Sequence, residues 1–281
     1  MRKIKLSIIA AVVAGSLTIA VGAVPGQAPP SQGDVTAQDV APVAFTYTGP
    51  DITVAVSVHG NIVRFESPTG FEHIGVGAFS EGYILCYTAP GTGARQAVDT
   101  GGFDNGVFGA AIVGSASTVR STDGPNGDGG KVQLRQSYAF SGSDRKLKIT
   151  NRLRNMTNET LTNVSFRRQV DFDIDTGGAS GWAGFANDFA TDGNDRVTAW
   201  NTPGEAPSPT ASHSMSLRAI DADSPHDARV TASILDDSCD ASSAVSPDVT
   251  SDEVDYGATL RYHIGTLGPK ATAEINVMYD R

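Results

Sequence analysis

Apolar and polar residues alternate with a period of two through much of the chain after residue 43, which is typical of half-buried β-strands. The stretch Ile52–His59 places branched aliphatic side chains on one face and smaller or polar side chains on the other. His59-Gly60-Asn61 then turns the chain into a second alternating stretch, Ile62–Glu66. This pattern predicts an opening β-hairpin.

The clearest pair of strands lies in the middle of the chain. Apolar side chains share one face of Val132–Phe140 and one face of Leu147–Leu153, and Ser141–Asp144 supplies a turn between them. We therefore expect a long antiparallel hairpin with one face in water. The stretch Val164–Asp175 reads as a further strand, with Arg168 on its apolar face. An inward Arg needs an acidic or carbonyl partner, unless a bulge shifts the register there.

Five later stretches also read as strands: Arg196–Trp200, Met215–Ile220, Val230–Leu235, Thr259–Ile264 and Ala271–Tyr279. No stretch after the N-terminal region carries a helical apolar stripe of ten or more residues. The chain is therefore predicted to be all-β. We expect a large antiparallel β-sandwich, with a supersandwich as the candidate architecture and with long Asp- and Gly-rich loops.

The N-terminus predicts export. Three basic residues within positions 2–5 precede the uncharged stretch Leu6–Ala23, which ends in small residues. Residues 1–23 are interpreted as a cleaved signal peptide; the alternative is an uncleaved anchor, since 18 uncharged residues approach the length needed to span a bilayer. Residues 24–43 then form a flexible leader, and residues 44–281 form a single β-sandwich domain. The mature protein is expected to be secreted or in the cell envelope, without a membrane span.

Charge narrows the classes of partner. The chain has 31 acidic and 21 basic residues, and its net charge of -10 becomes more negative once the signal is removed. No cluster of Lys and Arg is expected to offset this charge, which argues against a nucleic-acid partner. Most of the acids are Asp, which favours turns and oxygen-rich cation sites.

Cys86 and Cys239 are the two cysteines of the chain, and both lie in the part predicted to be exported. An oxidising compartment permits a disulfide, so we predict that they pair. Two separate buried thiols are the alternative.

The densest group of acids begins on one strand face with Asp171, Asp173 and Asp175, and the following Gly-rich loop carries Asp192 and Asp195. Clustered carboxylates repel one another, and a hard cation such as Ca²⁺ relieves that repulsion through oxygen ligation. These residues are the candidate calcium site. The alternative is a set of solvated or turn-forming acids, some of them paired with Arg.

Two groups of residues are candidates for ligand binding. Trp182 and Asp188 are the first group: the aromatic ring would stack on a sugar, and the carboxylate would accept hydrogen bonds from its hydroxyl groups. The alternative is that the ring of Trp182 packs into the core. His263 alternates onto the same face as Arg261, where the two would form a polar pocket or a plain strand surface. The chain has no HExxH, GxSxG or phosphate-loop motif, whereas a pair of acids for glycoside hydrolysis is left open because its spacing is set in space.

Two passages resemble a known group of proteins. The stretch Leu147–Leu153, followed by Asn155, Glu159 and Leu161–Val164, is similar to the strand-turn-strand passage of exported bacterial β-sandwich domains. Ile264–Pro269, with the strand after it, resembles the turn that closes such domains. Together with the chain length, they distantly resemble the galactose mutarotase-like group, which includes sugar epimerases and sandwich domains of polysaccharide lyases. This resemblance implies a fold more than an activity.

These observations favour an exported, non-catalytic binding protein whose partner is an extracellular carbohydrate or another surface component. One alternative is a carbohydrate-active enzyme, such as an epimerase or a polysaccharide lyase. Another is a structural envelope protein whose loops are stabilised by calcium.

Overall fold

Strands make up most of the chain that the computed structural model describes. The described residues are 43–74, 81–100, 112–115, 118–122, 131–141, 143, 145–174, 187–200, 214–220, 224–232, 238–241, 244, 250–254 and 256–281. The chain divides into two units, Met1–Pro30 and Ser31–Arg281, and every described residue lies in the second. The predicted signal peptide and leader therefore lie almost entirely outside the described residues.

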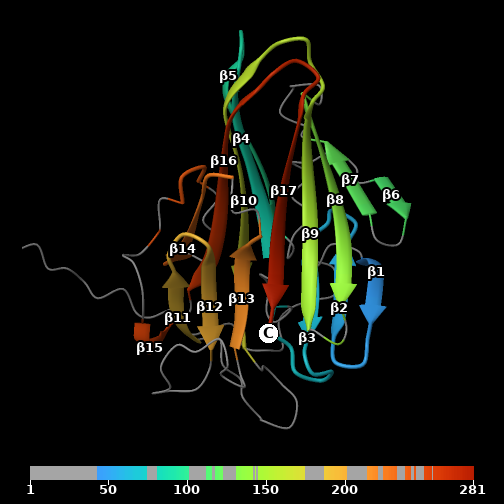
Figure 1. Ribbon diagram of the computed structural model, residues 1–281, viewed down its shortest axis with the longest axis vertical. Coiled ribbons are helices and arrows are strands. Elements are labelled where there is room, and N and C mark those ends of the chain that lie inside the picture. Colours follow the sequence, from blue (N-terminus) through green and yellow to red (C-terminus); the bar gives the residue numbers. More distant parts are fainter. Residues whose placement is uncertain are drawn as a thin grey trace, which may run out of the picture. The chain divides into compact units, whose positions relative to one another are not determined.

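The strands of the second unit form three antiparallel sheets (Figure 1). The smallest sheet has the order β1 (Val43–Thr48), β2 (Thr53–Ser57) and β3 (Ile62–Glu66). The five-stranded sheet has the order β14 (His226–Thr231), β16 (Gly257–Leu267), β10 (Leu161–Asp171), β4 (Glu81–Ala89) and β5 (Gly93–Thr100). The nine-stranded sheet has the order β15 (Thr250–Val254), β11 (Asn187–Asp192), β12 (Arg196–Trp200), β13 (Ser214–Ala219), β17 (Thr272–Asp280), β9 (Lys146–Asn155), β8 (Val132–Ser141), β7 (Thr118–Thr122) and β6 (Ile112–Ser115).

The predicted all-β sandwich is confirmed, and no helix occurs among the described residues. The central hairpin pairs in the expected register, from Val132 opposite Asn155 to Ser141 opposite Lys146. Several strand limits differ from the prediction by a few residues. Strand β14 begins at His226 rather than Val230, and β10 ends at Asp171.

Strands β4 and β5 did not stand out in the sequence pattern. Strand β4 lies inside the five-stranded sheet, and eight of its nine residues are buried. A strand that is covered on both faces has no polar face, so apolar residues follow one another from Tyr83 to Tyr87 without a period of two.

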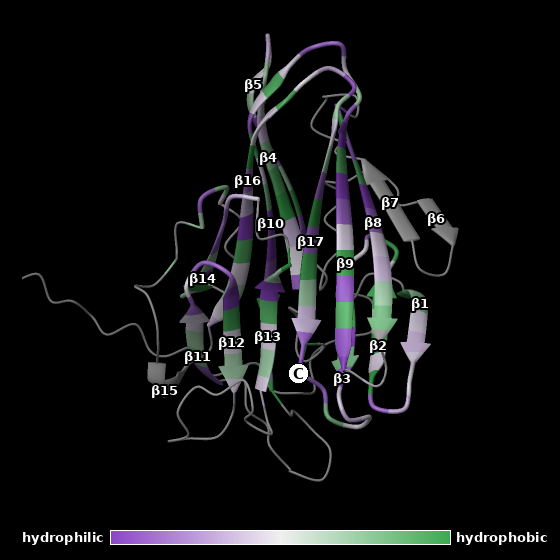
Figure 2. Ribbon diagram, in the orientation of Figure 1, coloured by the Kyte–Doolittle hydropathy of each residue, from purple (hydrophilic) through white to green (hydrophobic). Residues whose placement is uncertain are grey.

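The apolar core lies between the five- and nine-stranded sheets. Leu134, Ile149 and Val277 of the larger sheet and Phe166 and Leu260 of the smaller one are fully buried in a single cluster. Figure 2 shows hydrophilic and hydrophobic residues alternating along β9, as expected for a strand with one face in the core and one in water. None of the described segments forms a helix that is long and apolar enough to cross a bilayer.

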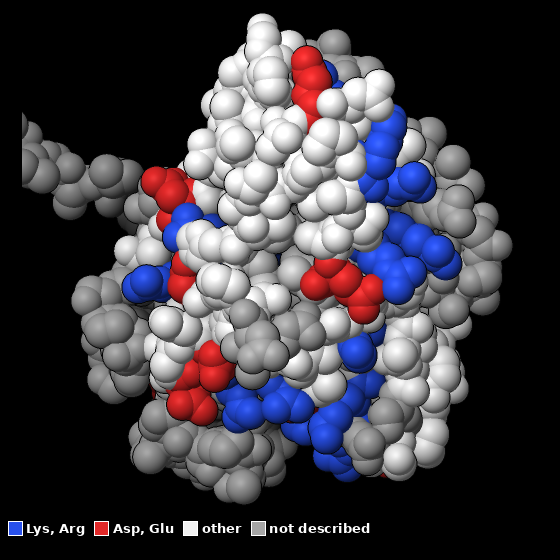
Figure 3. Space-filling model, turned by 45° about the horizontal axis from the view of Figure 1, so that its top comes forward, with Lys and Arg blue, Asp and Glu red and all other residues white. Residues whose placement is uncertain are grey.

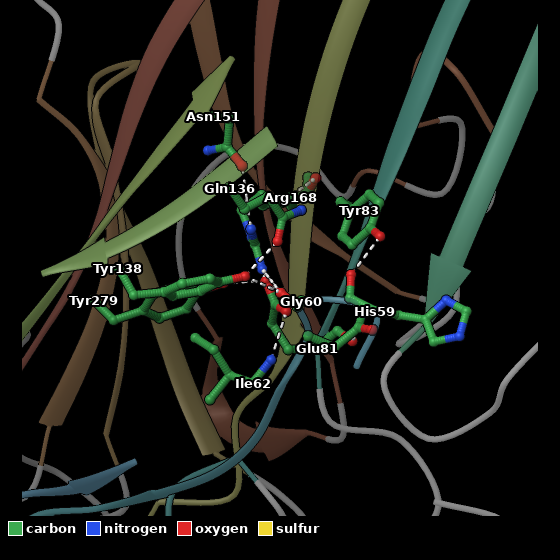
Figure 4. A network of polar contacts seen from close by, with 12 residues as sticks. His59, Gly60, Ile62, Glu81, Tyr83, Gln136, Tyr138, Asn151, Arg168 and Tyr279 are labelled. Carbon is green, nitrogen blue, oxygen red and sulfur yellow. Dashed lines mark hydrogen bonds and ion pairs between the residues drawn. The ribbon is translucent and has the colours of Figure 1, made fainter. Parts of the chain in front are cut away.

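A buried ion pair lies between the sheets and accounts for the inward Arg168 (Figure 4). Both side chains, Arg168 of β10 and Glu81 of β4, are fully buried, and Nε of Arg168 donates to the Glu81 carboxylate. Nη2 donates to the Gly60 carbonyl at 3.2 Å, and Nη1 donates to Oδ1 of Asn151 at 3.4 Å. Arg168 therefore has both the acidic and the carbonyl partner that its inward position requires.

Further hydrogen bonds from the other two sheets complete the network. The Tyr279 hydroxyl and the Ile62 backbone N–H donate to the Glu81 carboxylate at 2.9 and 3.0 Å. The Tyr138 hydroxyl donates to the Gly60 carbonyl at 2.6 Å. Burial raises the pKa of both tyrosines, and the Glu81 carboxylate raises that of Tyr279 further, so both hydroxyls keep the proton that they donate.

Gly60 is required where the three sheets meet. Its φ of 86° lies in the left-handed region, and a Cβ at this position would lie 2.1 Å from Oε1 of Gln136 and 2.7 Å from the Tyr138 hydroxyl. A larger residue would therefore strain the backbone and displace side chains of the network.

We expect the Glu81→Gln substitution to destabilise the protein by about 3–5 kcal/mol, because it leaves Arg168 buried without its counter-charge. The measurement is urea-induced unfolding of Glu81→Gln and, as a separate comparison, of Glu81→Leu, Arg168→Met and the double variant Glu81→Leu/Arg168→Met. The double variant should lose less than the sum of the losses of its two single variants. Additive losses would contradict a coupled buried pair.

Asn155 holds together the two chain segments that cross between the sheets. One segment joins β9 to β10, and the other joins β16 to β17. The buried Asn155 amide donates to the carbonyls of Glu159 at 2.7 Å, Leu267 at 3.0 Å and Gly268 at 2.9 Å, and its Oδ1 accepts from Thr157. The two passages that carried the family resemblance therefore meet at one side chain. Because Asn155 is buried, its Asn-x-Thr sequence is a structural feature and not an accessible acceptor for a glycan.

Replacement of Asn155 by Ala should destabilise the protein by about 2–3 kcal/mol, since several buried carbonyls would lose their donor. Asn158, which is exposed in the same turn, provides the matched control, and Asn158→Ala should change stability little. Equal unfolding midpoints for the two variants would contradict the role assigned to Asn155.

Candidate functional site

The outward face of the nine-stranded sheet contains a groove of about 510 Å³. Its lining residues come from the neighbouring strands β8, β9 and β17: Gln133, Arg135, Arg152, Arg154, Thr272 and Glu274. Figure 3 shows Lys and Arg side chains gathered along one side of this part of the molecule, with a few acidic side chains beside them. The groove is therefore lined mainly by guanidinium groups and by polar, uncharged side chains.

Strand register places these side chains next to one another. In one row Arg135 lies opposite Arg152, which lies opposite Glu274. In the adjacent outward row Arg154 lies between Gln133 and Thr272. Because the apolar positions of the same strands point into the core, the alternation that builds the sandwich also brings the arginines onto one open face.

The positive charge of the groove is only partly compensated. Nε of Arg152 lies 2.6 Å from the Glu274 carboxylate, and the two side chains are 54% and 42% exposed. Among the described residues, Arg135 and Arg154 have no carboxylate partner. Nε of Arg135 is buried and has no hydrogen-bond partner in that part of the chain. The groove thus presents two guanidinium groups that no described carboxylate compensates, and such groups match carboxylate, sulfate or phosphate groups.

This surface corrects the expectation that no basic cluster offsets the net negative charge. A signal is present in the sequence, because residues 131–155 contain seven Lys or Arg and a single acid, Asp144. These cations do not form a run, since apolar residues separate them along the strands. Pairing of the two strands brings them together in space.

The predicted pair Arg261 and His263 meets at a third residue, Asp227, on the outward face of the five-stranded sheet. Nη2 of Arg261 lies 3.0 Å and Nε2 of His263 lies 2.6 Å from Oδ2 of Asp227. Burial raises the pKa of Asp227, but hydrogen bonds from His263 and Arg261 outweigh that effect and hold the pKa below its ordinary value. The Asp227 side chain is 10% exposed. The Asp227 carboxylate of β14 thus interacts with side chains of β16 and stabilises the pairing of these two strands.

The predicted disulfide lies beside this cluster and is confirmed. Cys86 of β4 is bonded to Cys239, and the two Cα atoms are 5.9 Å apart. Nη1 of Arg261 donates to the Cys239 carbonyl at 3.2 Å. The bond therefore fixes the segment around Cys239 onto the sheet face that carries Asp227. A disulfide is compatible with a chain that folds in an oxidising compartment.

The other predicted ligand-binding residues do not join Arg261 and His263. Asp188 is buried on β11 of the nine-stranded sheet, where it lies opposite Trp200. Trp182 lies outside the described residues. Arg261 and His263 therefore form a salt-bridge cluster of their own, and the pairing of Trp182 with Asp188 stays a prediction.

The candidate calcium ligands are distributed over two places. Asp171 and Asp173 are buried near the end of β10, and both have interactions within the protein. Asp192, the last residue of β11, and Asp195, in the turn that follows, are exposed. Oδ1 of Asp195 lies 2.7 Å from Nε2 of His226. Asp175 lies outside the described residues. Within the part of the chain that is described, no three acidic, His or Cys side chains are placed to hold a metal ion, and the calcium site stays a prediction.

We expect the Asp227→Asn substitution to destabilise the protein at neutral pH, because Arg261 loses its counter-charge. The carboxylate has a lowered pKa in the folded state, so its stabilising effect is present above the ordinary value of 3.8 and is lost as the pH falls through the folded value. The stability gap between variant and wild type should therefore narrow in strong acid. Urea unfolding at neutral and acidic pH measures it, with the exposed Asp240→Asn as control. A pH-independent gap would contradict this account.

The sequence matches no protein-family model and no curated protein. Among solved structures the chain is similar to a bacterial glucoamylase complexed with acarbose, with a TM-score of 0.51 and 10% identity over 86% of this chain and 32% of that chain. It is also similar to a galactose mutarotase related enzyme from Lactobacillus acidophilus, with a TM-score of 0.43 and 10% identity over 84% of this chain and 96% of that one. An aldose epimerase homologue from C. elegans has a TM-score of 0.46 and 8% identity over 84% of this chain and 97% of its own. At these identities the likeness is one of fold, and the expected distant resemblance to galactose mutarotase-like proteins is confirmed at that level.

Proposed function

We propose that this protein binds an extracellular acidic carbohydrate at the arginine-lined groove without transforming it. The observation that carries the proposal is the meeting of three arginines from β8 and β9 in one open groove, where only Arg152 has a carboxylate partner among the described residues. Uronate carboxylates and sulfate esters are the carbohydrate groups that a guanidinium binds with two parallel hydrogen bonds.

The rest of the groove suits hydroxyl groups. Gln133 and Thr272 offer uncharged donors and acceptors, and Glu274 accepts hydrogen bonds. The groove lining includes no aromatic ring on which a nucleic-acid base would stack. A bacterial glucoamylase contains a similar fold in 32% of its chain, so this fold occurs in a protein that acts on carbohydrate.

Binding without turnover is favoured by the acids of the groove. Glycoside hydrolysis commonly needs two carboxyl groups on either side of the scissile bond. The groove lining contains one, Glu274, and Arg152 engages it. We further propose that residues 1–23 direct export and are removed, which would place the groove where extracellular polysaccharides occur.

The double variant Arg135→Gln/Arg154→Gln tests the groove. We expect it to bind polygalacturonate or chondroitin sulfate at least about 100-fold more weakly, at roughly tenfold for each charge-assisted hydrogen bond lost. Isothermal titration of the mature protein measures this, with Arg64→Gln/Arg229→Gln as a control that removes the same charge from other strands.

The choice of probes separates the outcomes. Preference for polygalacturonate identifies carboxylates as the recognised group. Chondroitin sulfate carries both carboxylates and sulfates, so preference for it identifies sulfates as an additional recognised group. Equal binding of neutral dextran, or tighter binding of single-stranded DNA, would overturn the proposal. New reducing ends or an unsaturated product after incubation would replace the binding function with an enzymatic one.

A further inference from the structure

A second cation group lies on the same outward face of the nine-stranded sheet, beyond the groove. It consists of Lys146 and Lys148 of β9, Arg218 of β13 and Arg196 of β12. Strand register aligns three of them in one row, in which Lys148 lies opposite Met278, Met278 opposite Arg218, and Arg218 opposite Arg196. The group therefore crosses four neighbouring strands.

Two carboxylates accompany these cations, because Asp192 of β11 lies opposite Arg196 at the end of the row. Nε of Arg218 lies 3.2 Å from Oδ2 of Asp280, whose side chain is 17% exposed. Burial raises the pKa of Asp280 even though Arg218 and two further cations of the group lie close enough to lower it. At neutral pH four cations thus face two acids, and the group carries a net positive charge.

The surface between the groove and this second cation group is polar and uncharged. The intervening outward row contains Ser137, Thr150 and Asn276, and the Thr150 hydroxyl donates to Oδ1 of Asn276 at 2.6 Å. Arg152 and Lys148 are four residues apart on β9, so the two charged rows are separated by roughly 13 Å along the strand. No acidic side chain of these three strands interrupts the path in that row.

We propose that the ligand is a linear polyanion that runs along β9 and β17 and places separate anionic groups on the groove and on the second cation group. This inference rests on the proposed function and specifies its ligand as a polymer rather than a single acidic sugar. A ligand that reaches both groups gains from a second, intramolecular contact, whereas a short one binds only at the groove. The hydroxyl-rich row between the two groups suits the neutral part of a sugar repeat.

The test compares oligogalacturonates of increasing length. With the wild-type mature protein, we expect the affinity to rise by about 100-fold between the disaccharide and the first oligosaccharide that spans both groups. In Lys148→Gln/Arg218→Gln the advantage of the long oligosaccharide over the disaccharide should fall at least tenfold. Arg229→Gln, which removes a charge from the five-stranded sheet, should keep the wild-type advantage.

Two further measurements keep the result interpretable. Lys148→Gln alone leaves the contact between Arg218 and Asp280 intact, so a partial loss of the length advantage in this variant, with an unchanged melting temperature, separates binding from folding. An affinity that is independent of length, or a length advantage that survives both substitutions, would overturn this inference while leaving the groove proposal in place. Failure of the wild type to bind any oligogalacturonate or sulfated oligosaccharide would overturn both.

Discussion

The structure depends on a charge pair buried where three sheets meet. Arg168 and Glu81 come from adjacent strands of the five-stranded sheet, and neither is exposed to water. Such a pair is tolerated only when the remaining donors and acceptors are satisfied, and this requirement explains the surrounding residues. Gly60 offers its carbonyl because its backbone adopts a conformation that other residues rarely reach, and Tyr279 keeps its proton because burial raises its pKa. The partners come from all three sheets, so a shift of one sheet against another would leave a buried charge without its partner.

The outward faces of the five- and nine-stranded sheets differ in whether their charged side chains have a counter-charge within the protein. On the five-stranded sheet, Asp227 is shared by Arg261 and His263, and the disulfide holds a further segment against them. Those charges stabilise the fold and leave little capacity for a ligand. On the nine-stranded sheet, Arg135 and Arg154 lie in an open groove without a described carboxylate partner. Residues of similar chemistry thus have different roles, and the presence of an internal counter-charge decides between them.

The sequence pattern predicted the elements whose two faces differ. The strands of the hairpin β8–β9 alternate between core and water, and their period of two located them. Strand β4 is covered on both faces and carries no such signal. The pattern also showed that Arg168 faces inward and needs a partner, but it could not name Glu81, which is 87 residues away. The candidate site was missed for the same reason, since Arg152 and Glu274 are 122 residues apart and meet only through the pairing of β9 with β17.

Net charge was a poor guide to this surface because electrostatic interactions in salt solution are local. At physiological ionic strength, exposed charges are screened over about 8 Å, so the excess of acids elsewhere on the chain has little effect on an anion seated among the arginines. The two cation groups are themselves separated by roughly 13 Å, which exceeds that screening length. Each group therefore acts mainly on the anion nearest to it, and a ligand with a single charge gains almost nothing from the more distant group. A chain of regularly spaced anions gains from both, because its own covalent structure carries the second anion to the second group. The positions of cations along β9, set by the same period of two that builds the core, thus favour a polymer over its isolated repeat unit.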